Sequence, residues 1–216
     1  MAVTVYTYGQ LQKSLLAGLI NFTSDTIKAM LLSSYTIGTT LDTAQFLNIV
    51  TAAGTEATGS GYTAGGATLA SKTVTYTAAN SWSIQRANST AYALGDVVRP
   101  ASANGYVYQA VVAGTSGGSV PTYPTVVGTT VTDGGVTWAC QGSGVLVVDA
   151  ADPSWTTSNP GTLAGSHIVF YKDTGTPSTS PVIALWDLGG TQTATNGGAF
   201  TATLDSTEGL LVVFAG

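Results

Sequence analysis

The chain has 216 residues, of which 8% are charged, with six Lys or Arg against eleven Asp or Glu. Typical globular domains carry about a quarter of charged residues. The basic residues are scattered singly, which excludes a basic stripe for nucleic acid and a surface for anionic membranes. With 27 Gly and many Thr, Ser, Ala and Val, the composition predicts a β-rich protein whose weakly charged surface packs against copies of itself or a larger assembly.

The termini and the cysteine content indicate a compartment. The first residues lack a basic region followed by an apolar one, so no secretory signal is expected. Apolar runs are of strand length and far too short for a membrane span. The single Cys140 excludes an intrachain disulfide framework and a cysteine-based zinc site. These features predict synthesis in a reducing cytoplasm.

The first 50 residues carry the predicted helices. Leucines recur at four-residue spacing in residues 11–19, which predicts a short amphipathic helix that ends near Gly18. An apolar run in residues 25–34 predicts a strand. A second short helix is predicted over residues 41–50, where an Asp and a Gln three residues apart resemble a capping box.

The rest of the chain consists of short Val-, Thr- and Tyr-rich runs separated by Gly, Asn, Pro and Ser, which predict strands and turns. Such spacing is typical of an antiparallel β-sandwich or jelly roll. No alternation of strands with helices is present, so an α/β nucleotide-binding fold is not expected. The clearest predicted strands are residues 72–76, 96–100, 106–112, 135–140, 144–149, 167–171, 182–188, 199–204 and 209–215.

Two segments, residues 66–76 and 128–138, align with each other and both end in Val-Thr followed by an aromatic residue. Each predicts a hairpin whose second strand ends in a large aromatic anchor. Convergent hairpin chemistry is the preferred explanation, and an ancestral duplication stays open. The repeat is too short to indicate a solenoid.

Catalytic patterns are poorly represented. The only histidine, His167, has no second His, no nearby Cys and no GxSxG serine to complete a triad or zinc site, so it is interpreted as an ordinary strand residue. Asp149 and Asp152 precede Pro153 and are interpreted as turn residues rather than a carboxylate pair or calcium ligands. The glycine-rich stretches lack the Lys-Ser/Thr of a phosphate loop. We therefore expect no enzymatic activity, no metal and no cofactor.

Aromatic side chains gather in residues 81–144. Sugar rings stack on exposed, flat aromatic faces, so these side chains are candidates for glycan binding. Alternation along a strand places two of the tyrosines on one face, roughly 7 Å apart. The alternative is that a module of roughly 60 residues builds its core from them. The tyrosine between two prolines, Tyr123, is the one most expected at the surface. The candidates are Tyr106, Tyr108, Tyr123, Trp82 and Trp138.

The outer parts of the chain resemble a family of tailed-bacteriophage virion proteins. The stretches that carry the resemblance are "YGQLQKSLLAGLINFTSDTIKAMLLSSYT", "EATGSGYTAGGATLASKTVTY", "VVDAADPSW" and "HIVFYKDTGTPSTSPVIALWDLGG". In the plain form of this family the "KTVTY" strand is soon followed by the "DPSW" turn. The resemblance therefore implies one domain of residues 1–80 plus 145–216, with residues 81–144 inserted at a hairpin tip, where insertions are tolerated.

The inserted segment resembles a second group, the small Trp- and Tyr-rich modules related to chitin- and cellulose-binding domains. The stretches that carry this resemblance are "YALGDVVRP", "GYVYQAVVAGTSGGSVPTYP" and "GTTVTDGGVTWAC".

Together the two resemblances imply a non-enzymatic virion structural protein, a capsid-decorating (cement) or head-fibre protein. Its implied partners are the major capsid protein or other virion proteins, a second or third copy in a homo-oligomer, and a possible glycan. The alternative is a tail-associated adhesin that binds host-surface glycans.

Overall fold

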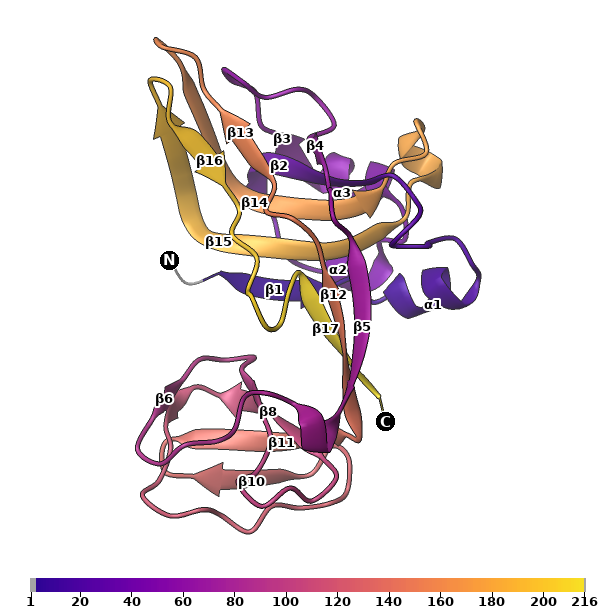
Figure 1. Cartoon of the computed structure of the whole chain (residues 1–216). Helices are drawn as coiled ribbons and strands as arrows, with labels where there is room; N and C mark the ends of the chain where they lie inside the picture. Colours follow the sequence, from indigo (N-terminus) through magenta and orange to yellow (C-terminus); the bar gives the residue numbers. More distant parts are fainter. Residues whose placement is uncertain (1–2, 216) are drawn as a thin grey trace. The chain divides into compact units, whose positions relative to one another are not determined.

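The computed structural model describes residues 3–215 and divides the chain into two compact units (Figure 1). Unit 1 comprises residues 1–73 and 149–205, and unit 2 comprises residues 74–148 and 206–216. The chain is mainly β, with several antiparallel sheets, which confirms the predicted sandwich-like fold class. Within residues 3–215 no helix has both the length and the apolar character needed to cross a membrane.

The unit boundaries differ from those that the sequence resemblance implied. Unit 2 begins at residue 74 rather than 81, and it also takes in residues 206–216. The reason is a strand pairing at the end of the chain. Strand β17 (Leu211–Ala215) runs antiparallel to β12 (Gly144–Asp149), with Val148 opposite Leu211 and Gly144 opposite Ala215. The last strand therefore completes a sheet of unit 2 and not of the outer domain.

Unit 1 is built on a sheet with the order β1-β15-β14-β2-β3, with β4 beside β2. The central strand β14 is buried along nearly all of its length. Helices contribute to the apolar cluster on one face of this sheet, and Figure 1 shows the antiparallel pair of β13 and β16 over the other. The strands are β1 (Thr4–Thr7), β2 (Ile27–Tyr35), β3 (Gly54–Glu56), β4 (Ala67–Thr68), β13 (Ser154–Thr156), β14 (Thr162–Lys172), β15 (Val182–Thr195) and β16 (Ala199–Thr201).

The helices of unit 1 are α1 (Leu11–Leu16), α2 (Thr40–Thr43) and α3 (Leu47–Ala53). Helix α1 confirms the predicted helix in residues 11–19. The single helix predicted over residues 41–50 is wrong, because the chain leaves the helical conformation after Thr43 and re-enters it at Leu47. Between the two helices the carbonyl of Gln45 accepts a hydrogen bond from the amide of Val182, and this pairing extends the backbone. Two 3-10 turns complete the helical content, η1 (Ala79–Ser81) in unit 2 and η2 (Pro177–Thr179) in unit 1.

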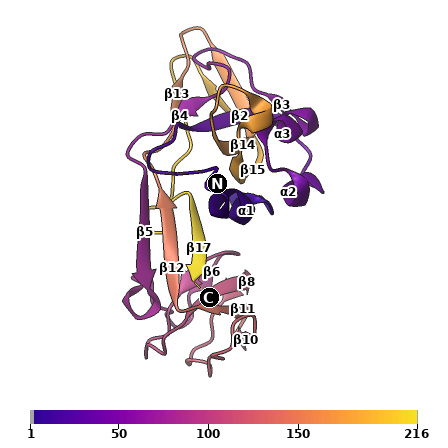
Figure 2. The same cartoon turned by 90° about the vertical axis from the view of Figure 1, so that its right-hand side faces the viewer.

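Unit 2 contains a four-stranded sheet of order β10-β11-β8-β7, a three-stranded sheet of order β17-β12-β5, and the short pair β6 and β9. Figure 2 shows β5, β12 and β17 side by side. The remaining strands are β5 (Thr73–Ala78), β6 (Ala91–Tyr92), β7 (Val97–Val98), β8 (Val107–Val112), β9 (Gly114–Thr115), β10 (Thr130–Asp133) and β11 (Val136–Gly142).

Strand alternation gives unit 2 two apolar clusters. Val97 and Val107 point to one face of the four-stranded sheet and pack with Val145 of β12. Their neighbours Val98 and Tyr108 point to the opposite face, into a second cluster. Successive side chains of a strand alternate between faces. Adjacent apolar residues in β7 and in β8 therefore cover both faces of this sheet.

The two segments predicted as hairpins behave differently. Strands β10 and β11 form a hairpin within residues 130–142, with Asp133 opposite Val136, as predicted. Residues 66–76 do not form one. Strand β4 pairs instead with β2, placing Ala67 opposite Ala29, and β5 joins the sheet of β12.

Candidate functional site

Three of the five predicted glycan-binding residues lie in the core of unit 2. The side chains of Trp138 and Tyr108 are completely buried, and Trp82 is 3% exposed. A ring that is covered on both faces offers no surface for sugar stacking. The structure therefore corrects the expectation of an exposed platform for these three residues and agrees with the alternative, in which they form the core of the module.

The polar atoms of the buried rings are used internally. The Tyr108 hydroxyl accepts a hydrogen bond from Asn104 at 2.7 Å and donates one to the carbonyl of Pro124 at 2.7 Å. The Trp82 Nε1 donates to the carbonyl of Val97 at 2.9 Å. Burial is the main cause that raises the pKa of Tyr108 to about 12. These contacts tie loops to strands, which is a structural role.

The other two candidates are only half-buried. Tyr123 stacks on Tyr108 with ring centroids 4.3 Å apart and planes inclined by 42°, and Tyr106 packs against the same apolar cluster. The predicted common face for Tyr106 and Tyr108 exists, but it faces the core. The hydroxyl of Tyr123 is buried and has no hydrogen-bond partner among residues 3–215. These two side chains retain the exposure that contact with a ligand requires.

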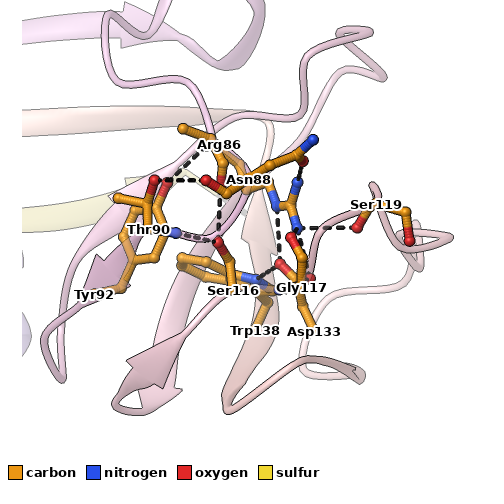
Figure 3. Close-up of polar contacts among 10 residues, drawn as sticks. Arg86, Asn88, Thr90, Tyr92, Ser116, Gly117, Ser119, Asp133 and Trp138 are labelled. Atoms are coloured by element: carbon orange, nitrogen blue, oxygen red, sulfur yellow. Dashed lines mark hydrogen bonds and ion pairs between the residues drawn. The ribbon is translucent and has the colours of Figure 1, made fainter.

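A buried ion pair, which the sequence did not predict, organises the loops of unit 2 (Figure 3). Arg86 and Asp133 meet through two hydrogen bonds, Nη2 to Oδ1 at 2.7 Å and Nε to Oδ2 at 2.9 Å. The guanidinium also donates to the carbonyls of Gly117 and Ser119 and to the side chain of Asn88. One arginine therefore joins the loop of residues 114–119 to the β10–β11 hairpin.

Asp133 receives two further hydrogen bonds, from Trp138 Nε1 at 2.9 Å and from the amide of Gly117 at 2.9 Å. Burial alone would raise the pKa of Asp133, but the hydrogen bonds from Arg86, Trp138 and Gly117 outweigh it and lower the pKa below its ordinary value. Hydrogen bonds to a charged form favour that form. The cluster is thus a satisfied, permanently charged network that uses up its donors and acceptors.

In unit 1 a polar cluster surrounds a wide bulge between β14 and β15. The register moves from Gly165 opposite Gln192 to His167 opposite Asp187, which leaves Ser166 opposite an expanded loop of β15. The side chains of Asp187 and Gln192 hydrogen-bond to backbone groups of this loop. Bulges often redirect side chains at functional positions.

This bulge brings together a serine, a histidine and an aspartate. The Ser166 Oγ lies 2.8 Å from His167 Nδ1, and His167 Nε2 lies 3.7 Å from Asp187 Oδ1. The serine hydroxyl donates to the carbonyl of Ser33 at 3.1 Å, and its oxygen can accept a hydrogen bond from His167 in the Nδ1–H tautomer. Burial lowers the pKa of His167, and the attraction of Asp187 offsets only part of this effect. The net effect favours the neutral imidazole of His167.

A groove of about 410 Å³ opens on unit 1 beside the β15 bulge. Its apolar floor includes Trp186 and Phe200, which are themselves nearly buried. No charged side chain lines it, so it provides no counter-ion for a charged ligand. The lining residues are Val3, Trp186, Leu188, Gln192, Thr193, Ala194, Ala199, Phe200, Thr201, Ala202 and Thr203.

The two aspartates of the "DAADPSW" stretch hold backbone amides. Asp149 accepts from the amide of Ala150, and Asp152 accepts from the amide of Leu204 at 2.9 Å. These contacts agree with the turn interpretation made from the sequence.

No protein family, curated protein or solved structure matches the chain.

Proposed function

We propose that the chain is a non-enzymatic structural protein of a tailed-bacteriophage particle, a capsid-decorating or head-fibre protein. Unit 1 binds the major capsid protein or another virion protein, and copies associate with each other. The observation that carries this proposal is the surface of unit 1, where an open sheet edge and exposed apolar side chains lie in residues 3–19, whose one charged residue is Lys13. Such surfaces suit a protein that is covered in an assembly.

The sequence resemblance supports the same assignment. The stretches "FTSDTIKAMLLSSYT" and "HIVFYKDTGTPSTSPVIALWDLGG" supply all of β2, about half of β14 and the start of β15. These three strands are hydrogen-bonded neighbours in the sheet of unit 1. These two stretches thus form one contiguous structural element, whereas the "KTVTY" and "VVD" segments of the other stretches belong to β5 and β12 of unit 2.

The position of the aromatic side chains favours decoration over the adhesin alternative. An adhesin that binds glycans through unit 2 requires exposed ring faces. Unit 2 uses Trp82, Tyr108 and Trp138 for its core, which leaves Tyr106 and Tyr123. A glycan contact is therefore a secondary activity of the proposed structural protein.

The test is to prepare particles without this chain and to measure how readily their heads release DNA on heating. A decorating protein stabilises the head, so bare heads should release DNA at a lower temperature, and added full-length chain should restore the original value. The matched control is the double variant Tyr106→Ala/Tyr123→Ala, which should restore head stability equally well. Unchanged head stability together with lost host adsorption would contradict the proposal and favour the adhesin.

A further inference from the structure

Strand β1 forms one edge of the sheet in unit 1. Its four residues, Thr4–Thr7, pair with Asp187 through Ala184 of β15, and within residues 3–215 no strand lies on its other side. In an antiparallel pair, alternate residues direct their N–H and C=O groups away from the partner strand. The outer side of β1 is therefore a row of backbone donors and acceptors ready to pair with an extended chain.

Apart from its short length of four residues, this edge lacks the features that usually protect an open edge. Natural edge strands are shielded by lysines, prolines, bulges or short length. Residues 3–12 contain no charged residue and no proline, and the pairing of β1 with β15 is regular. The opposite edge of the same sheet, β3, is three residues long, contains Glu56 and has an irregular register with β2. Of β1 and β3, β1 has the longer strand and the regular register, so the β1 edge is the one that we expect to accept a strand.

The side chains around this edge are apolar and exposed. Val3 and Val5 are 38% and 45% exposed, and Leu16 of the following helix α1 is 90% exposed. Leu15 and Leu19 are exposed as well. Burial of apolar surface is favourable by about 25 cal/mol per Å², so covering these side chains adds to the gain from backbone pairing.

A second copy of the chain fits this edge better than a charged partner. In a twofold contact only residues near the axis meet their own copies, so charged residues at its centre would repel each other, and residues 3–12 contain none. Antiparallel pairing brings the Val3 end of one strand to the Thr7 end of the other, near the leucines of α1. We propose that β1 pairs antiparallel with β1 of a second copy and joins the two sheets of unit 1 into one.

The proposed contact buries a small area, and this limits the affinity between two copies. Stable interfaces bury about 1,200–2,000 Å² in total, which a four-residue edge does not reach without the neighbouring leucines. We expect weak, concentration-dependent association in solution. Copies held side by side on a particle have a high effective concentration. The pairing itself does not depend on the proposed function; only its strengthening on a particle rests on that function. The pairing specifies which surface of unit 1 copies use to associate with each other.

The test is sedimentation velocity of the full-length chain over a range of concentrations. The wild type should associate reversibly, and Val5→Lys should weaken association at least ten-fold because it places like charges at the twofold contact. Leu16→Lys, at a position too exposed to affect folding, should also weaken it. The control is Val126→Lys in unit 2, which adds the same charge at a residue 65% exposed and should leave association unchanged.

Hydrogen exchange supplies a second measurement on the same samples. Amides of residues 4–7 should become more protected as the wild-type concentration rises, and not in Val5→Lys. A wild type that stays monomeric, or association that Val5→Lys and Leu16→Lys leave intact, overturns the proposed pairing. If such a monomer still stabilises phage heads, the proposed function stands without the pairing. A chain that associates through β1 but has no effect on heads keeps the pairing and overturns the function.

Discussion

The Arg86 guanidinium and the Asp133 carboxylate lie inside unit 2, with side-chain exposures of 0% and 2%. Charges removed from water are tolerated only when they are paired and fully hydrogen-bonded. Here both conditions are met, because Asp133 also binds Trp138 Nε1 and the amide of Gly117. The pair fixes the conformation of the loops around it, as a disulfide does in other small modules.

Asp133→Asn should destabilise unit 2 by about 3–5 kcal/mol, because it leaves a buried arginine without its counter-charge. The measurement is the labelling rate of Cys140, the only cysteine in the chain and a buried residue of unit 2. The control is Asp173→Asn, which breaks the partly exposed pair with Lys28 in unit 1. Such pairs contribute about 0–1 kcal/mol, so Cys140 labelling should not change. Equal labelling in both variants would contradict this account.

His167 predicts a pH dependence of unit 1. Its pKa is lowered in the folded chain, so the folded state resists protonation more than the unfolded state does. Stability is therefore complete above the ordinary pKa of about 6.5 and falls as the pH drops below it, by at most about 1.4 kcal/mol per pH unit. Hydrogen exchange of β14 amides at pH 7, 6 and 5 measures this loss.

His167→Gln should remove the loss between pH 7 and 5. Acid sensitivity at lower pH should remain, because Asp173 and Asp25 have lowered pKa values and lose their contribution only as the pH falls below about 4. A variant with the same pH dependence as the wild type between pH 7 and 5 would show that His167 is not the responsible group.

The sequence predicted where some of these residues lie but not which side chains they contact. His167 was correctly placed on a strand, but its contacts with Ser166 and Asp187 depend on a bulge that no local pattern indicates. Arg86 and Asp133 are 47 positions apart, and nothing in either neighbourhood marks a partner. The sequence indicates that the aromatic residues of unit 2 form either its core or a glycan-binding surface, but composition does not distinguish a buried aromatic ring from an exposed one.

At the scale of elements, the close approach of β4 to β2 depends on a glycine. Gly66 has φ +80°, and a Cβ at this position would lie 1.9 Å from the carbonyl oxygen of Ala29. That carbonyl belongs to the strand with which β4 pairs. Any side chain at residue 66 would therefore separate two paired strands, in addition to straining the backbone.

Gly66→Ala should cost clearly more stability than Gly175→Ala. Gly175 has the same φ of +80°, but a Cβ there meets no atom within 4 Å. The second variant therefore measures only the left-handed backbone, about 1–2 kcal/mol, and the difference between the two isolates the steric effect. Urea denaturation of both variants provides the comparison. Equal losses would mean that β4 moves freely away from β2.

Long, regular elements were the predictable ones. Strands β2, β8, β12, β14 and β15 follow from apolar or alternating runs of sufficient length, and α1 follows from its leucine spacing. The helix predicted over residues 41–50 failed because a pairing with Pro181 and Val182, far along the chain, extends the backbone between α2 and α3. Strands β6 and β9 have two residues each and form by pairing with each other, which neither sequence indicates alone.

At the scale of the whole molecule, the sequence indicated two structural units but not their exact composition. Residues 209–215 were predicted as a strand, and pairing with β12 assigns them to unit 2. A strand's partner is a long-range property that its own residues do not encode. The same holds for assembly, since the exposed valines and leucines before residue 20 are recognisable as a surface only after the fold leaves them uncovered.

The most direct test of the proposed function is a three-dimensional image of the phage particle that carries this chain, at a resolution that distinguishes β-sheets. The account predicts density for unit 1 on the outer surface of the head, with the edge strand β1 beside β1 of a neighbouring copy. Density only at the tail tip, or removal of the chain from particles by washing without any change in the head, would contradict it.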